Sequence, residues 1–177
     1  MAKFHSIKVL DIYKETKDCL VISFDIPAEL KQDFSFKQGQ HITLRATIDD
    51  KEERRSYSLC SSPLENKWKV AIKKIEGGLF SNYVQEKLQI GDFVDIMPPN
   101  GNFSVAINPS KPKNYIAFAA GSGITPIISI IKTHLAQEPN STFKLFYLNR
   151  TVKSIIFKEE IEQLKNVYLN RFEIFHF

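Results

Sequence analysis

A segment with two prolines and two lysines, residues 108–113, divides the chain into two parts whose hydrophobic patterns differ. Before this segment, short runs rich in valine, isoleucine and phenylalanine alternate with turn residues, as they do in all-β domains. After it, strand-like runs alternate with helix-like runs, which is typical of α/β domains. We therefore expect a β domain over residues 1–108, joined to an α/β domain over residues 109–177.

Six runs predict strands in the first part: residues 4–13, 19–26, 41–48, 54–61, 68–75 and 92–97. One helix is expected over residues 79–88, after a pair of glycines. Six strands with a single short helix favour a closed antiparallel β-barrel, since closure removes the exposed edge strands.

The second part predicts three strands and two helices in alternation. The strands are expected over residues 115–119, 142–148 and 171–177, and the helices over residues 126–136 and 154–165. This β-α-β-α-β order is the first half of a doubly wound parallel nucleotide-binding sheet. The fold class expected for the whole chain is therefore β followed by α/β.

Composition excludes several classes of function. The net charge of +4 is small and spread along the chain, so no nucleic acid partner is expected. The N-terminus lacks the apolar core of a signal peptide, and no run is long enough to span a membrane, which favours a cytoplasmic location. Two cysteines, Cys19 and Cys60, cannot form a four-cysteine site and are expected as buried thiols; we expect no metal site.

The strand containing Arg55-Ser56-Tyr57-Ser58 combines a cation, an aromatic ring and hydroxyl groups. Arg55 and Tyr57 should share one strand face, with Ser58 on the other. A guanidinium can hold a phosphate bidentately, and a tyrosine ring offers a flat surface for another ring system. The alternative is a tyrosine packed on the barrel beside a surface ion pair of Arg55, and the motif alone leaves both interpretations open.

A second motif begins with Gly77 and Gly78 and ends with Ser81 in the first turn of the expected helix. Glycines allow close backbone approach to a ligand, and a helix N-terminus attracts anions, so the motif suits a pyrophosphate. An ordinary glycine turn with Ser81 near the helix cap is the alternative.

A third motif, residues 121–126, directly follows an apolar strand. Thr125 is expected as the N-cap and Pro126 as the first residue of the following helix. The loop would place a helix N-terminus at the carboxyl end of a strand, where a dinucleotide pyrophosphate binds. It lacks the third glycine of the common dinucleotide fingerprint, and Thr125 could serve as a cap alone, but the strand–loop–helix context favours ligand binding.

The end of the next strand carries Asn149-Arg150-Thr151, followed by Lys153 and Ser154. Arg150 or Lys153 could hold the 2′-phosphate of a nucleotide ribose, and no acidic residue there favours the unphosphorylated ribose. NADPH is therefore preferred over NADH. A solvated charged loop, with Ser154 as the N-cap of the second helix, is the alternative.

These motifs, in this order and spacing, resemble the ferredoxin–NADP reductase superfamily along the whole chain. The family's Arg-x-Tyr-Ser motif matches residues 55–58, its Gly-Gly-x-x-Ser motif matches the turn ending at Ser81, and its Gly-x-Gly-x-x-Pro loop matches residues 121–126. Within the family, local stretches are similar to the reductase components of multicomponent oxygenases of the phenylacetyl-CoA epoxidase type.

The resemblance implies a role for each matching residue. Arg55 would bind an FAD phosphate, Tyr57 would pack on the isoalloxazine, and Ser58 would approach flavin N5. Together with Thr125, Tyr57 and Ser58 would lie nearest the hydride transfer. The remaining FAD contacts are expected from Ile72, Lys73, Gly77, Gly78 and Ser81. The pyridine nucleotide would be bound by Gly121, Ser122, Gly123, Thr125, Arg150 and Ser154.

The implied activity is transfer of a hydride from NAD(P)H to FAD and of electrons onward to an iron–sulfur centre of an oxygenase partner. Members of this subgroup continue with the second half of the nicotinamide domain and a [2Fe–2S] domain, neither of which this sequence contains. We therefore expect a truncated chain that self-associates through its incomplete sheet. The alternative is a flavin-binding fragment without catalysis.

Overall fold

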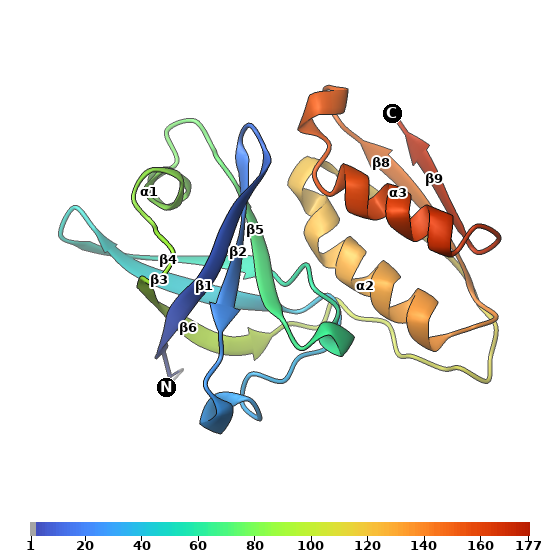
Figure 1. The fold of residues 1–177 in the computed structure, drawn as a ribbon, viewed down its shortest axis with the longest axis horizontal. Helices are drawn as coiled ribbons and strands as arrows, with labels where there is room; N and C mark the ends of the chain where they lie inside the picture. The colour runs from blue at the N-terminus through green and yellow to red at the C-terminus, as the bar shows by residue number, and fades with distance from the viewer. Residues whose placement is uncertain (1–2) are drawn as a thin grey trace.

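The protein is described here by a computed structural model that covers residues 3–177 (Figure 1). It has two lobes, a β-rich lobe formed by the first half of the chain and an α/β lobe formed by the second. The connecting segment 101–113 crosses from one lobe to the other, and the expected boundary at residue 108 lies within it. The predicted fold class, β followed by α/β, is confirmed.

Six antiparallel strands form the first lobe in the order β4-β3-β6-β1-β2-β5. Their bounds are β1 His5–Thr16, β2 Cys19–Asp25, β3 His41–Ile48, β4 Lys51–Ser58, β5 Trp68–Lys73 and β6 Phe93–Asn100. The two outer strands meet where Leu59, just after β4, forms a bridge with Val70 of β5. The sheet thus curls into a barrel that closes at one end, as expected.

The β3–β4 hairpin is longer than the sequence predicts. Asp49 and Asp50 form a two-residue turn with φ values of 49° and 61°, which aspartate tolerates better than most residues. Because the turn is tight, Ile48 pairs with Lys51 and β4 begins there, three residues before the expected start at Arg54.

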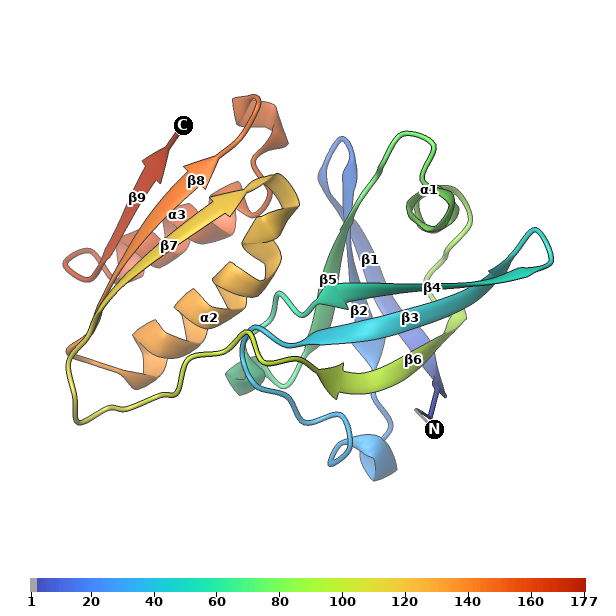
Figure 2. The same cartoon turned by 180° about the vertical axis from the view of Figure 1, so that it is seen from behind.

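Three parallel strands form the second lobe in the order β7-β8-β9, with bounds β7 Asn114–Ala120, β8 Thr142–Leu148 and β9 Phe172–His176. Helices α2 (Ile124–Gln137) and α3 (Lys158–Val167) both cover one face of this sheet (Figures 1 and 2). The opposite face carries stacked rings: Phe118 and Phe146 have centroids 5.0 Å apart, and Phe146 and Phe175 4.8 Å apart. No described helix covers that face, and Phe118 is 71% exposed.

Both helices of the second lobe begin elsewhere than expected. Helix α2 begins at Ile124, so Thr125 is its second residue rather than its N-cap, and Pro126 is its third. Helix α3 begins at Lys158 rather than Ser154, because its N-cap is Phe157, which takes a left-handed conformation with φ 60°. Residues Val152–Ser154 form a separate short 3₁₀ segment, η4. Helix α1 (Leu79–Glu86) starts where predicted.

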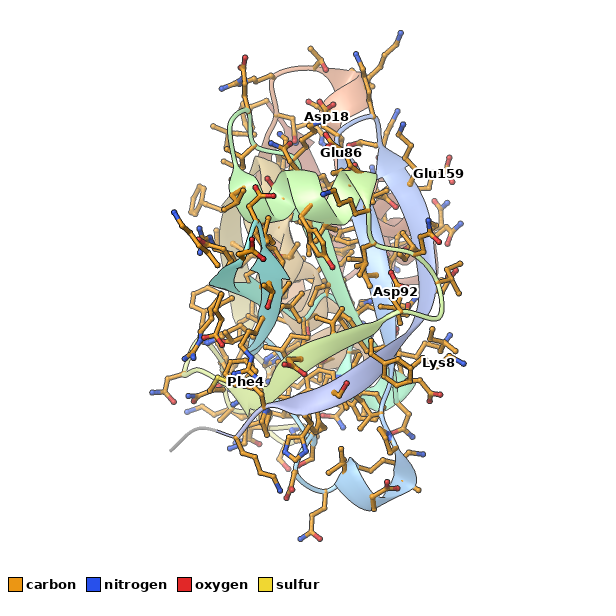
Figure 3. All side chains as sticks on the ribbon, turned by 90° about the vertical axis from the view of Figure 1, so that its left-hand side faces the viewer. Phe4, Lys8, Asp18, Glu86, Asp92 and Glu159 are labelled. Carbon is orange, nitrogen blue, oxygen red and sulfur yellow. The ribbon has the colours of Figure 1, made fainter. Side chains whose placement is uncertain are left out.

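The two lobes share a hydrophobic core and polar contacts. Cys19, Val21 and Ala71 of the barrel belong to the same buried cluster as the apolar residues of α2 and β8. Ser129 of α2 donates a hydrogen bond to the carbonyl of Ser61 at 2.7 Å. Glu159 of α3 lies beside the upper end of β1, as Figure 3 shows.

An ion-pair cluster also joins the lobes. The Lys132 ammonium lies 2.8 Å from Glu65 in the barrel lobe and 2.9 Å from Glu160 on α3. Burial alone would lower the pKa of Lys132, but the two carboxylates outweigh it and raise the pKa, so the ammonium stays charged. Both cysteines are buried free thiols, as predicted.

Candidate functional site

Two adjoining cavities open between the ends of β4 and β5 and the start of α2. The first, about 400 Å³, is lined by Tyr57 and Ser58 of β4, by Ala71, and by Gly123, Thr125 and Pro126. The second, about 740 Å³, is lined by Ala120, Gly121, Leu148, Asn149, Arg150 and Phe177. Lys73, Ile75 and Ser122 line both. The cavities are therefore neighbours with a common wall.

Tyr57 forms a side wall of the first cavity. Its ring is half-buried and lies 6.0 Å from the ring of Phe80 on α1, so the packing fixes its orientation. Burial raises the pKa of Tyr57, which keeps its hydroxyl group neutral. A fixed, neutral aromatic ring at a cavity wall can pack against a flat ligand.

Five of the residues predicted to contact FAD line neither cavity: Arg55, Ile72, Gly77, Gly78 and Ser81. Arg55 lines neither cavity, and its guanidinium pairs with the Glu53 carboxylate at 2.9 Å. Its side chain is 50% exposed, so it remains open to solvent. Ile72 is fully buried in the barrel core, so its side chain faces away from both cavities. Its two neighbours in β5, Ala71 and Lys73, both line the first cavity, and Lys73 lines the second as well.

The turn before α1 is stabilised by hydrogen bonds between its own residues. Gly77 has φ +69°, and Gly78 is the N-cap of α1. The Ser81 hydroxyl is buried, accepts a hydrogen bond from the Ile75 backbone N–H at 3.1 Å and donates one to the Gly78 carbonyl at 3.4 Å. Ser81 lines neither cavity, but Ile75, whose backbone N–H it accepts from, lines both.

The loop before α2 is more open. Gly121 has φ +50°, and a Cβ added at Gly123 would meet no atom within 4 Å. Ser122 is exposed on the wall shared by the cavities. Thr125 lines the first cavity, but its hydroxyl donates to the Ser122 carbonyl at 3.1 Å and stabilises the loop itself.

Arg150 and Ser154, both predicted to bind the nucleotide, line the second cavity. Arg150 is exposed on its wall, whereas Lys153 lines a different cavity beside β1. The Ser154 hydroxyl lies on the wall and also donates to the Thr151 carbonyl at 2.8 Å. It does not cap α3.

Asn149, which was not among the residues predicted to bind a cofactor, also lines the second cavity. Both polar atoms of its side-chain amide are buried without a hydrogen-bond partner among the described residues. The amide nevertheless lies close enough to the Tyr147 hydroxyl to oppose the rise in the pKa of Tyr147 that burial causes. The position of Asn149 directly after β8 and before Arg150 is the sequence feature that could have indicated its place at this cavity.

The residues present fit FAD and a pyridine nucleotide. Small-molecule sites usually measure about 300 to 1,000 Å³, and both cavities, at about 400 and 740 Å³, lie in this range. The missing side chain of Gly123 leaves room at the wall of the first cavity, opposite the strand that carries Tyr57. Lys73 supplies a cation where the cavities meet.

The part of the chain that the structure describes has no helix suited to crossing a membrane and no side-chain cluster suited to a metal ion. None of its helices is long and apolar enough to cross a bilayer. Within residues 3–177, no three histidine, cysteine or carboxylate side chains are grouped so that they could hold a metal ion.

Comparison with known proteins identifies both lobes. Residues 6–105 match the family model described as the oxidoreductase FAD-binding domain, and residues 118–177 match the oxidoreductase NAD-binding domain. Among curated proteins, one of the subunits of 1,2-phenylacetyl-CoA epoxidase from Escherichia coli (strain K12) is 42% identical over 98% of this chain and 49% of its own length. The ferredoxin reductase component of 3-ketosteroid-9-alpha-monooxygenase from Rhodococcus rhodochrous is 37% identical over 96% of this chain and 48% of its own length. The chain thus spans about half the length of these relatives.

Solved structures agree with the fold. Phthalate dioxygenase reductase, described as a modular structure for electron transfer from pyridine nucleotides to [2Fe–2S], has a TM-score of 0.78 at 25% identity, over 98% of this chain and 51% of its own. Ferredoxin–NADP⁺ reductase from Plasmodium falciparum with 2′P-AMP has a TM-score of 0.83 at 22% identity, over 98% and 73%. The resemblance seen in the motifs is confirmed: the chain belongs to the ferredoxin–NADP reductase family of FAD- and NAD-binding oxidoreductases.

Proposed function

We propose that this chain is the flavin- and nucleotide-binding part of a reductase that passes electrons from NAD(P)H through FAD to an oxygenase partner. The observation that supports this most directly is the common wall of the two cavities, formed by Lys73, Ile75 and Ser122. A flavin ring in the first cavity and a nicotinamide entering from the second would meet at that wall. Bound FAD supplies the redox chemistry, accepting a hydride and releasing electrons singly.

The protein's own residues would bind and orient FAD and the pyridine nucleotide. Tyr57 would cover one face of the flavin ring, with Ser58 at its edge, while Gly123 leaves the approach from α2 open. Lys73, at the junction of the cavities, would balance negative charge from either ligand. Holding the two reactants in contact accounts for much of the rate gain in such transfers.

Arg55 would hold an FAD phosphate only after leaving Glu53, 2.9 Å away. Side-chain ion pairs that are half exposed contribute little, about 0 to 1 kcal/mol, so a phosphate can replace the carboxylate. On this proposal, residues 1–108 form the domain that binds FAD and residues 109–177 form the domain that binds the pyridine nucleotide.

The exposed guanidinium of Arg150 at the second cavity favours NADPH over NADH, since it could pair with a 2′-phosphate. The 42% identity to a component of the Escherichia coli epoxidase favours an oxygenase of the phenylacetyl-CoA epoxidase type as the partner, with the accepting iron–sulfur centre outside this chain.

The test is to load the purified chain with FAD and titrate it with NADPH and with NADH without oxygen. The oxidised flavin absorption should bleach with either nucleotide, and at lower concentration with NADPH. Replacement of Arg150 by Gln should remove that preference while leaving NADH reduction unchanged. A chain that takes up no FAD, or one whose bound FAD neither nucleotide reduces, would overturn the proposal.

A second candidate is a flavin-binding chain without turnover that self-associates, and the bare face of the parallel sheet favours it. Phe118 and Phe177 are 71% and 67% exposed there, beside the stacked rings of Phe146 and Phe175. Apolar faces of this kind commonly bind another surface. Sedimentation of the chain, with Phe118→Lys as the variant that should restore a monomer, tests the self-association. Measurable NADPH-dependent turnover by the purified chain would rule out this candidate.

A further inference from the structure

Tyr147 is a fully buried tyrosine in β8 whose hydroxyl group meets the backbone of two other segments. Its oxygen lies 3.0 Å from the carbonyl oxygen of Gly121 and 3.3 Å from that of Ile156, and the side chain is 0% exposed. A phenol has one hydrogen to donate, so the two carbonyls share it, with Gly121 at the shorter distance.

We propose that Tyr147 is a positioning residue that fixes the peptide between Gly121 and Ser122 and so sets the shape of the nucleotide-binding loop. The proposal deepens the function proposed above and rests on residues 121–125 receiving the pyridine nucleotide. No sequence motif singled out Tyr147, since it precedes the charged end of β8 and reads as an ordinary core residue.

The Gly121 carbonyl is held from two sides. It also accepts a hydrogen bond from the Ile124 backbone N–H, in the first turn of the helix. In a planar trans peptide, the carbonyl of Gly121 and the N–H of Ser122 point in opposite directions. Fixing the carbonyl toward buried Tyr147 therefore fixes the Ser122 N–H on the opposite side of the peptide, and Ser122 is the loop residue that lines both cavities.

The other carbonyl links this loop to the barrel. Ile156 and Phe157 share a peptide whose carbonyl accepts from Tyr147 and whose N–H donates to the Glu15 carboxylate of β1 at 2.7 Å. Phe157 has φ 60°, a conformation that needs such support in a residue with a large side chain. Hydrogen bonds thus run from the barrel through Tyr147 to the nucleotide loop.

Loss of the hydroxyl would leave the ring packing intact. Tyr147 belongs to the shared buried cluster, and phenylalanine fills nearly the same volume. Tyr147→Phe therefore removes the donor to the two carbonyls and also the hydroxyl with which the Asn149 amide interacts, while the ring stays packed. Tyr115 offers a matched control at the far end of the same sheet, where its hydroxyl donates to the Glu138 carboxylate at 2.9 Å, away from both cavities.

The experiment compares Tyr147→Phe and Tyr115→Phe in the FAD-loaded chain. Binding of NADP⁺ is measured by equilibrium dialysis, together with FAD content, and amide hydrogen exchange is followed at residues 121–124. Tyr147→Phe should weaken NADP⁺ binding about tenfold and speed exchange at the loop, as the loss of one well-placed hydrogen bond predicts. Tyr115→Phe should change neither, and both variants should keep their FAD.

Unchanged loop exchange in Tyr147→Phe would overturn the positioning role, whatever the nucleotide affinity. So would an equal loss of NADP⁺ binding in both variants, because it would show a general loss of stability. A wild-type chain that binds FAD but no NADP⁺ would instead overturn the proposed function, and the exchange measurement would still decide whether Tyr147 holds the loop.

Discussion

The two glycine-rich turns of this protein, residues 77–81 and 121–125, have the same order of parts but different structures. Each follows a strand, contains two glycines, ends with a hydroxyl residue (Ser81 or Thr125) and leads into a helix. In the first turn, a Cβ added at Gly78 would lie 2.7 Å from the Ser81 hydroxyl oxygen, whereas at Gly123 in the second it would meet nothing within 4 Å. In both turns the hydroxyl bonds to the backbone of its own turn. In the first turn, the internal packing requires a glycine at position 78. In the second turn, the missing side chain of Gly123 leaves space for a ligand.

The largest effect is expected for a large side chain at Gly123, where the structure leaves free space beside the first cavity. Gly123 has φ −62°, so any residue fits its backbone, and a leucine there would fill part of the first cavity without strain. Gly123→Leu should slow flavin reduction by NADPH about 100-fold, because a displacement of about 1 Å between reactants can cost that much. Stopped-flow absorbance measures the rate. Gly123→Ala is the control. A leucine variant with the wild-type rate would contradict the interpretation that the reactants use the space beside Gly123.

The next largest effect is expected for Gly78→Ala, which should lower the stability of the folded protein. The added methyl group would meet Ser81 at 2.7 Å and the Ile75 carbonyl oxygen at 3.0 Å, so the turn must shift. Overpacking of this kind costs about 1 to 3 kcal/mol. Urea denaturation of the chain measures it, with Gly123→Ala in the other turn as the control that costs little. Equal stabilities of the two alanine variants would remove the difference drawn between the turns.

Ser81→Ala tests whether that hydroxyl serves the turn or a ligand. Its loss would leave the Ile75 N–H without its partner at 3.1 Å, and we expect about 1 kcal/mol less stability even without FAD. Denaturation of the FAD-free protein measures this. If stability stayed at the wild-type value while FAD affinity fell, the hydroxyl would be a direct phosphate ligand instead.

The smallest effect is expected at Thr125. Thr125→Val removes the hydrogen bond to the Ser122 carbonyl, at 3.1 Å, and keeps the shape of the side chain, so about 0.5 to 1 kcal/mol should be lost. Thermal unfolding compares it with Thr125→Ser, which retains the donor. A valine variant as stable as the serine variant would mean that the loop does not depend on this bond.

Local patterns were enough to predict most of the fold. The strands of the barrel and the β-α-β-α-β order followed from hydrophobic runs and turn residues, and the three motifs placed the glycine loops, Tyr57 and Arg150 on the right elements. The interpretation of Thr125 and Ser154 as helix caps was wrong, because glycine in one case and a left-handed Phe157 in the other decide where the helices begin.

The placement of individual side chains was harder to predict. Arg55 remains the predicted phosphate ligand, but in the structure its guanidinium pairs with Glu53, two residues away on the same strand, at 2.9 Å. The side chain of Ile72 lies in the barrel core rather than at the cavities. The bonds of Tyr147 to Gly121 and Ile156 depend on how β8 lies between two loops, which no local pattern specifies.

The core shared by the two lobes has a consequence for how the protein can be divided. Cys19, Val21, Cys60 and Ala71 of the barrel are buried in one cluster with α2 and β8. A protein cut after residue 108 would expose these side chains to water, at a cost that rises with each Å² of apolar surface. The cofactor-binding regions are therefore not separable modules. They should melt in a single transition, and proteolysis of the connecting segment should release no stable barrel.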